Sequence, residues 1–139
     1  MKFEDFIKKG KVRKISEDNH LILSLIERAK KDIKLFGNIR LDDISSSKVM
    51  TNHFDILRTV LEAVSVKRGY KIYEHEAFTY LLKEIGEGQI SIRFDRYRKI
   101  RNRVNYYGEE VPIEKAREFI NDIKKIIDYL LDKYLGEFK

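Results

Sequence analysis

The chain has 139 residues, which is about the length of one ordinary domain. It contains no cysteine, and this excludes disulfide scaffolds, cysteine-ligated zinc fingers and thiol catalysis. The formal net charge is +6, from 29 Lys and Arg residues against 23 Asp and Glu residues. Such a surplus is compatible with an anionic partner, although an excess of this size also serves solubility alone.

No apolar run approaches the roughly 20 residues of a membrane span, and the opening "MKFEDFIKKG" lacks the apolar core of a signal peptide. We therefore expect a cytoplasmic protein with no membrane partner. Charged residues make up 37% of the chain and Gln89 is its single glutamine, a composition that leans towards a thermophilic source. We find no internal repeat or low-complexity tract, so residues 1–139 are expected to form a single domain.

Residues 3–15 form a short N-terminal extension, after which the first long helix is expected to begin behind Ser16, a good N-cap residue, and to close at Gly37. Its apolar positions recur at helical spacing: Leu21, Ile22, Leu25, Ile26, Ala29, Ile33 and Phe36. The linker "NIRLDDISSS" offers three serines that could cap a second helix, which stops at Gly69. The apolar positions of this helix are Val49, Met50, Phe54, Leu57, Val60, Leu61 and Val64.

A shorter third helix is expected over residues 74–85, and "GEG" at residues 86–88 then breaks the chain. A fourth helix begins near Ile90 and runs to Gly108. The last helix starts at Pro112, a favourable first-turn residue, with acidic residues near its positive end. Its apolar positions are Ile113, Ala116, Phe119, Ile120, Ile123, Ile127, Leu130, Leu131 and Tyr134.

No segment shows sustained two-residue alternation of apolar and polar side chains, so the chain is expected to be all-α. Four long amphipathic helices and a shorter one, with mostly short connections, predict an antiparallel four-helix-bundle-like fold with a short N-terminal helical extension.

Arg101 is out of place on the fourth helix, within the stretch "RYRKIRNRVNYYG". At about 100° per residue from Ile90, the apolar residues Phe94, Tyr97, Ile100 and Val104 fall between about −80° and +40°. Arg101 falls near +20°, inside this apolar stripe. Because a guanidinium that is buried without partners costs several kcal/mol, either Arg101 snorkels out of the interior or this flank lines a polar crevice or a subunit interface.

Two interpretations of this basic helix stay open at this point. Six of the eleven residues from Arg93 to Arg103 are basic, and they could form a solvated face in which Arg101 pairs with a carboxylate of another helix. A basic helix interleaved with tyrosines is also typical of nucleic-acid binding, through phosphate contacts and base stacking. The lysine-rich segment at residues 8–14 could extend such a patch.

The order of motifs along nearly the whole chain resembles that of HEPN-domain proteins, in particular a small stand-alone archaeal and bacterial group. The motif of that group, Arg-x-x-Ala-Asp-Tyr, corresponds to "RNRVNY" at residues 101–106, with Val104 for Ala and Asn105 for Asp. The other matching segments are "IKKGKVRKI", "KRGYKIYEHEAFTYLL" and "EEVPIEKAREFI".

The resemblance implies a helical bundle that forms a homodimer and brings two copies of the arginine motif together across a cleft. Many HEPN domains are metal-independent ribonucleases of toxin–antitoxin or defence systems, often encoded beside a small nucleotidyltransferase. Their nuclease motif has an Arg, often followed by a polar residue, with four to six residues between this Arg and a His. Here Arg101 and Asn102 match the first half, but Tyr106 stands where the His is expected.

This departure matters for catalysis. A His with an ordinary pKa of about 6.5 suits the proton transfers of RNA cleavage, whereas a Tyr, ordinarily near 10, must be strongly shifted to serve. Arg101 retains the ability to bind phosphate or to stabilise developing charge. Whether the chain is an enzyme is therefore left open. The alternative interpretation is a non-catalytic helical protein that partners a nucleotidyltransferase.

The candidate site residues follow from this stretch. Arg101, Asn102 and Tyr106 are the candidate catalytic residues, while Arg98, Arg101, Asn105 and Tyr107 are candidates for binding RNA or a nucleotide. A structural interpretation of Tyr106 and Tyr107 also stays open, in which both are packing residues that close the helix against Gly108. His20 and His53 are expected as surface or partly buried side chains and His75 in a structural or capping role; no metal or cofactor site is predicted.

Overall fold

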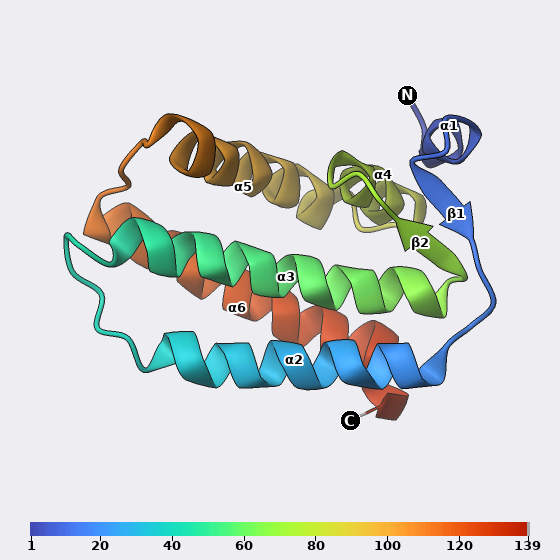
Figure 1. Ribbon diagram of the computed structural model, residues 1–139, viewed down its shortest axis with the longest axis horizontal. Coiled ribbons are helices and arrows are strands. Elements are labelled where there is room, and N and C mark those ends of the chain that lie inside the picture. Colours follow the sequence, from blue (N-terminus) through green and yellow to red (C-terminus); the bar gives the residue numbers. More distant parts are fainter. Residues whose placement is uncertain (139) are drawn as a thin grey trace.

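The computed structural model of the protein describes residues 1–138. Four long helices, α2 (Asn19–Gly37), α3 (Ser46–Lys67), α5 (Gly88–Tyr107) and α6 (Ile113–Leu135), run alternately up and down along the long axis (Figure 1). This arrangement confirms the prediction of an all-α helical bundle.

Helix α3 is the central helix of the bundle. Fourteen of its 22 residues are buried, and it packs against both α2 and α6. The ring of Phe54 stacks on that of Phe94 with a centroid distance of 5.2 Å, which ties α5 to the same core. Burial of one such phenyl side chain contributes about 1.5–3 kcal/mol, so this contact helps to hold α5 against α3.

The smaller elements lie together at one end of the bundle (Figure 1). They are α1 (Phe3–Lys8), β1 (Val12–Lys14), β2 (Tyr70–Ile72) and α4 (Glu76–Glu84), and a 3-10 turn, η1 (Gly136–Phe138), follows α6. Strands β1 and β2 pair antiparallel, with Val12 opposite Ile72. The sequence did not predict this two-stranded sheet, because three-residue strands are too short to show an alternating pattern.

Most predicted helix boundaries lie within two residues of those observed, and the differences have local causes. The N-cap of α2 is Asp18, whose carboxylate accepts a hydrogen bond of 3.0 Å from the N–H of Leu21, so the prediction of Ser16 was wrong. Helix α5 begins at Gly88 and ends against Gly108, which adopts a left-handed conformation with a φ of 67°. This φ suits a glycine that closes a helix.

His53 corrects another expectation. It is 1% exposed within the core, and its Nδ1 lies 2.8 Å from the carbonyl oxygen of Val49. Burial lowers the pKa of His53, so the imidazole is neutral at pH 7. His20, at the start of α2, is exposed as expected.

The angular prediction for α5 agrees with the observed burial. Ile90, Phe94 and Tyr97 are buried, while Ile100 and Val104 are partly buried against the core. Among residues 1–138, no helix combines the length and the apolar composition needed to cross a membrane.

Candidate functional site

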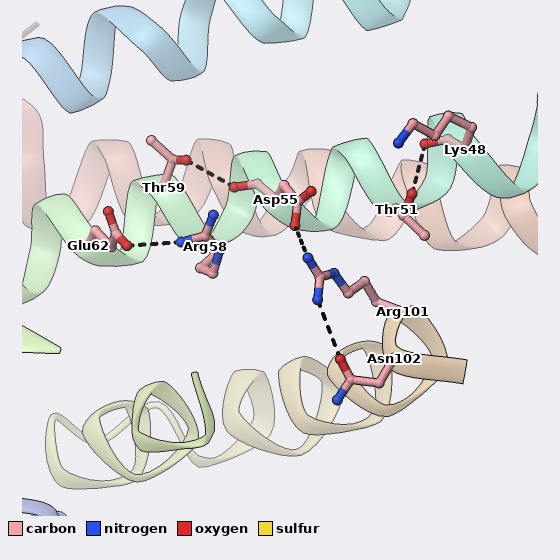
Figure 2. Close-up of polar contacts among 8 residues, drawn as sticks. All are labelled: Lys48, Thr51, Asp55, Arg58, Thr59, Glu62, Arg101 and Asn102. Atoms are coloured by element: carbon pink, nitrogen blue, oxygen red, sulfur yellow. Dashed lines mark hydrogen bonds and ion pairs between the residues drawn. The ribbon is translucent and has the colours of Figure 1, made fainter. Parts of the chain in front are cut away.

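Helix α3 carries a polar stripe on the side that is not covered by α6. Its members recur every three or four residues and are all partly buried: Asn52, Asp55, Arg58, Thr59 and Glu62. Figure 2 shows four members of this stripe, with α2 on one side and α5 on the other: Asp55, Arg58, Thr59 and Glu62. Within it, Arg58 Nη1 donates a hydrogen bond of 2.9 Å to Glu62 Oε1. Since the rest of α3 is largely buried, the stripe is where polar chemistry can occur on this helix.

Arg101 extends from α5 towards this stripe rather than out into solvent (Figure 2). Its Nη2 lies 3.5 Å from Asp55 Oδ1, and its side chain is only 16% exposed. Its Nη1 lies 3.5 Å from Asn102 Oδ1. Strong hydrogen bonds between a guanidinium and a carboxylate are about 2.7–2.9 Å long, so the contact with Asp55 is a weak one. The contact with the Asn102 amide oxygen is equally long, and the two together hold Arg101 loosely. The structure confirms a carboxylate partner on another helix and excludes snorkelling.

Three polar atoms of this cluster are buried without any hydrogen-bond partner. They are Asp55 Oδ1, Arg58 Nε and Arg101 Nε, and residues 1–138 contain only six such side-chain atoms. Asp55 Oδ1 meets Arg101 at ion-pair distance, but the geometry does not make a hydrogen bond. Because most buried polar groups are satisfied in folded proteins, this concentration marks a place where a further donor or acceptor can be accommodated.

A groove of about 560 Å³ runs along the α2 side of the stripe. Asp55 and Arg58 therefore line the groove while Asp55 also meets Arg101 from the α5 side. The groove is lined by Ser24, Leu25, Arg28, Asp32, Phe36, Asn52, Asp55, Arg58 and Thr59. A ligand in it would lie over the two α3 residues whose polar atoms lack partners.

His75 belongs electrostatically to the same cluster. It occupies the N-cap position of α4, but its side chain makes no capping hydrogen bond, so the predicted capping role is wrong. Burial lowers the pKa of His75, and the positive charges of Arg58 and Arg101 lower it further. The imidazole is therefore neutral at pH 7 and can accept a proton, within range of the charges on Arg58 and Arg101. No periodicity in the sequence signals this proximity, because it depends on how β2 and α4 fold back on α3.

The other predicted binding residue in the middle of α5, Arg98, has a well-defined partner. Its Nη2 and Nε donate hydrogen bonds of 2.8 Å and 3.1 Å to Asp95 Oδ1. Burial opposes ionisation of Asp95, but hydrogen bonds from Arg98 and Lys99 outweigh it and lower the pKa of Asp95. Arg98 is thus held firmly, in contrast with Arg101.

The remaining basic residues of α5 are largely paired on its surface. Arg93 Nη1 lies 2.6 Å from Asp122 Oδ1, and Arg103 Nε lies 3.0 Å from Glu109 Oε2. This agrees with the interpretation of α5 as an ion-paired, solvated face. The segment at residues 8–14 lies at the end of the bundle where α5 begins, so it does not extend the basic surface around Arg101 (Figure 1).

Asn105, Tyr106 and Tyr107 lie in the last turn of α5. Tyr106 is 71% exposed and Tyr107 is 84% exposed, and Asn105 is exposed as well. In the described part of the chain, no hydrogen bond or ion pair joins these three residues to Arg101. The prediction that they line a cleft with Arg101 concerns a dimer and stays a prediction.

No metal site is apparent in residues 1–138, where no three or more His, Cys, Asp or Glu side chains are grouped to hold an ion. Comparisons with protein-family models, with curated proteins and with solved structures found no match to this chain. The resemblance to HEPN domains therefore stays a prediction from the sequence motifs.

Proposed function

We propose that the protein is an HEPN-like binder of RNA or a nucleotide, of the toxin–antitoxin or defence type, and that Arg101 contacts a phosphate group. The observation that carries this proposal is the state of Arg101, which is shielded from solvent, loosely paired with Asp55 and unpartnered at Nε. A planar guanidinium with free donors is suited to bidentate binding of phosphate.

Phosphate binding would resolve the unsatisfied donors of the cluster. A phosphate oxygen beside Arg101 would accept hydrogen bonds from Nε and Nη2, and Arg58, on the polar stripe of α3, would add a second positive charge. Asp55 is 38% exposed and can turn towards water when the anion takes its place. In the free protein, the negative charge of Asp55 offsets the electrostatic repulsion between Arg101 and the other basic side chains nearby.

Cleavage of RNA is the enzymatic form of the same proposal. It requires activation of a ribose 2′-hydroxyl and protonation of a leaving oxygen, for which a group that exchanges protons near neutral pH is needed. Tyr106, at 71% exposure, has no contact that would activate it, whereas His75 is neutral and near Arg101. We therefore expect any cleavage to depend on Arg101 and His75 more strongly than on Tyr106.

Binding is tested by titrating labelled single-stranded RNA against wild type and Arg101→Ala. Loss of one charge-assisted hydrogen-bonding group is worth about 1.5–3 kcal/mol, so the affinity should fall about tenfold to 150-fold. Loss of one phosphate contact should also lower the slope of log affinity against log salt by about 1.

Arg103→Ala is the matched control, because it removes the same charge from the same helix at an exposed position. If both variants weaken RNA binding equally, the effect is general charge and the assignment of Arg101 is wrong. Incubation of the bound RNA with and without EDTA, followed by a gel, then separates cleavage from binding alone.

A second candidate function is a protein-interaction module that partners a nucleotidyltransferase as part of a two-gene system. It is favoured by the exposed apolar residues at the end of the bundle where α5 ends, which include Ile44 at 94% exposure together with Tyr106 and Tyr107. The first turn of α3, which follows Ile44, is joined to the connection that follows Tyr107, since Ser46 Oγ donates to the carbonyl of Val111 and Val111 N–H donates to Ser47 Oγ.

This second function is tested by co-expression with any nucleotidyltransferase encoded by the adjacent gene. A stable complex that Ile44→Asp disrupts and Arg101→Ala leaves intact would support it. Failure of the two proteins to co-purify, or an unrelated neighbouring gene, would contradict it.

A further inference from the structure

A second cavity lies between the first turns of α5 and the C-terminal half of α6. Its volume is about 820 Å³, within the range of small-molecule sites. It has apolar walls with cationic residues at the edge and is lined by Lys83, Gly86, Glu87, Gly88, Gln89, Ile90, Ile92, Arg93, Asp122, Lys125, Ile126 and Tyr129. None of these residues belongs to the Arg101 cluster, so the cavity is separate from the site proposed above.

Glu87 is the unusual group in this cavity. Its side chain is only 7% exposed, and its Oε1 accepts hydrogen bonds of 2.8 Å from Tyr129 OH and 3.2 Å from Lys133 Nζ. Hydrogen bonds to Tyr129 and Glu87 raise the pKa of Lys133, which therefore stays charged beside the carboxylate. The second oxygen, Oε2, is buried and has no hydrogen-bond partner. A buried carboxylate oxygen of this kind calls for an N–H or O–H donor.

The first turn of α5 favours an acceptor, in contrast to Glu87, whose free oxygen favours a donor. Glu87 occupies the N-cap position, yet its carboxylate is engaged with α6 and does not cap the helix. No acidic residue lies in the first turn and the Glu87 carboxylate is paired with Lys133, so the uncapped N–H groups of this 20-residue helix can donate hydrogen bonds to an anion. The chain reaches this turn through Gly86, whose φ of 87° few other residues adopt. Lys83 and Lys125, both exposed, add positive charge at the edge.

The walls between these groups are suited to a ring. Ile90 and Ile126 are buried beneath the cavity, while Ile92 is 63% exposed and Tyr129 is 42% exposed at its margin. Ile92 and Tyr129 both line the cavity, and their side chains offer apolar surface to a flat ring. The cavity therefore combines an anion site, an apolar surface and a buried hydrogen-bond acceptor.

We propose that this cavity binds a nucleoside monophosphate, with its phosphate at the first turn of α5 and Lys125, its base against Ile92 and Tyr129, and a base N–H directed to Glu87. This class of compound carries all three features in one small molecule. The site is distinct from the Arg101 cluster, and its occupation is independent of whether Arg101 binds phosphate.

The test uses the full chain, labelled with ¹⁵N, titrated with AMP, GMP, CMP and UMP, and separately with adenosine and inorganic phosphate. At least one monophosphate should saturate with a Kd below about 1 mM and shift the amide signals of residues 86–90 and 125–129. Inorganic phosphate and adenosine should each bind at least about tenfold more weakly.

Variants locate the ligand. Lys125→Glu should weaken binding at least about tenfold and Glu87→Gln at least about threefold, whereas Lys30→Glu, the same charge change on the exposed face of α2, should leave it unchanged. Arg101→Ala should also leave it unchanged, which separates this proposal from the function proposed above. Thermal melts of each variant check that it is folded.

Three results would overturn the proposal. The first is the absence of saturable shifts with any of the four monophosphates up to about 10 mM. The second is inorganic phosphate binding as tightly as the monophosphates, which would leave the base without a role. The third is loss of binding in Arg101→Ala but not in Lys125→Glu, which would place the ligand in the other site.

Discussion

Arg101→Met is the substitution that best separates a functional arginine from a structural one. Arg101 lies at the angle of the apolar stripe of α5, near +20° on a scale of about 100° per residue, and its side chain is 84% shielded, the complement of its 16% exposure. Methionine has a similar length and is flexible enough to fill this position. If Arg101 is retained for binding rather than for stability, removing its charge should stabilise the fold.

The magnitude follows from the contacts. The buried Nε without a partner costs about 1–3 kcal/mol in the wild type. The ion pair with Asp55, at 3.5 Å and with 38% of the carboxylate side chain exposed, contributes about 1 kcal/mol at most. Asp55 remains partly hydrated after the change. We therefore expect the free energy of unfolding to rise by about 1 kcal/mol and the Tm by about 3–5 °C.

Urea unfolding followed by far-ultraviolet circular dichroism measures this change, with Arg103→Met as the control. Arg103 is exposed and paired with Glu109, so its replacement should change stability by less than about 0.5 kcal/mol. RNA binding should fall for Arg101→Met while stability rises, as expected when a functional residue lies in a destabilising position. A loss of stability greater than about 1 kcal/mol would show that the pair with Asp55 is structural, and the reasoning would be refuted.

Three further predictions concern the fold. Asp18→Ala should lower the free energy of unfolding by about 1 kcal/mol through loss of the N-cap of α2, while Ser16→Ala should leave it unchanged; urea unfolding of both variants decides which residue caps the helix. Tyr97→Phe removes the hydrogen bond that the buried hydroxyl donates to Asp122, leaves that carboxylate with Arg93, and should cost about 1 kcal/mol; a Tm equal to that of the wild type would contradict this. Burial lowers the pKa of His53 and of His75 below the ordinary value, so the unfolded chain binds more protons and stability should fall as the pH drops from about 7 to about 5. The fall should be shallower in His53→Gln, and a stability that does not change over this range would show that these histidines are not shielded.

The long helices could be predicted because each repeats its apolar positions over about four turns or more. The stripe on α6, for example, runs from Ile113 to Tyr134, and most of its members are buried. The cap of α2 was harder to place, since Ser16 and Asp18 are both good N-cap residues and only the backbone path decides between them. The pairing of Val12 with Ile72 joins segments that are far apart in the chain and too short to carry a pattern.

Only the α5 side of the candidate site could be predicted from the sequence. The angular position of Arg101 was correct, but its partner was not identified, although the acidic residues Asp55 and Glu62 interrupt a largely buried helix at a spacing of seven residues. That interruption is a signal in the sequence, because charged side chains on a buried helix cost free energy unless they have partners. The nearness of His75 has no such signal, because it arises from the turn that brings α4 back over α3 and α5.

The two sides of the Arg101 cluster differ in rigidity, and this difference bears on what the cluster can bind. Asp55 and Arg58 project from the central helix, whose backbone is fixed by fourteen buried residues. Arg101 and Asn102 project from the last turns of α5, beyond the ring stack of Phe54 and Phe94 that holds this helix to the core. A fixed carboxylate and arginine facing a loosely held guanidinium can adapt to anions of different shape with little loss of packing. Recognition of a backbone phosphate, which is the same in every nucleotide, requires this kind of adaptable contact more than it requires a tightly formed pocket.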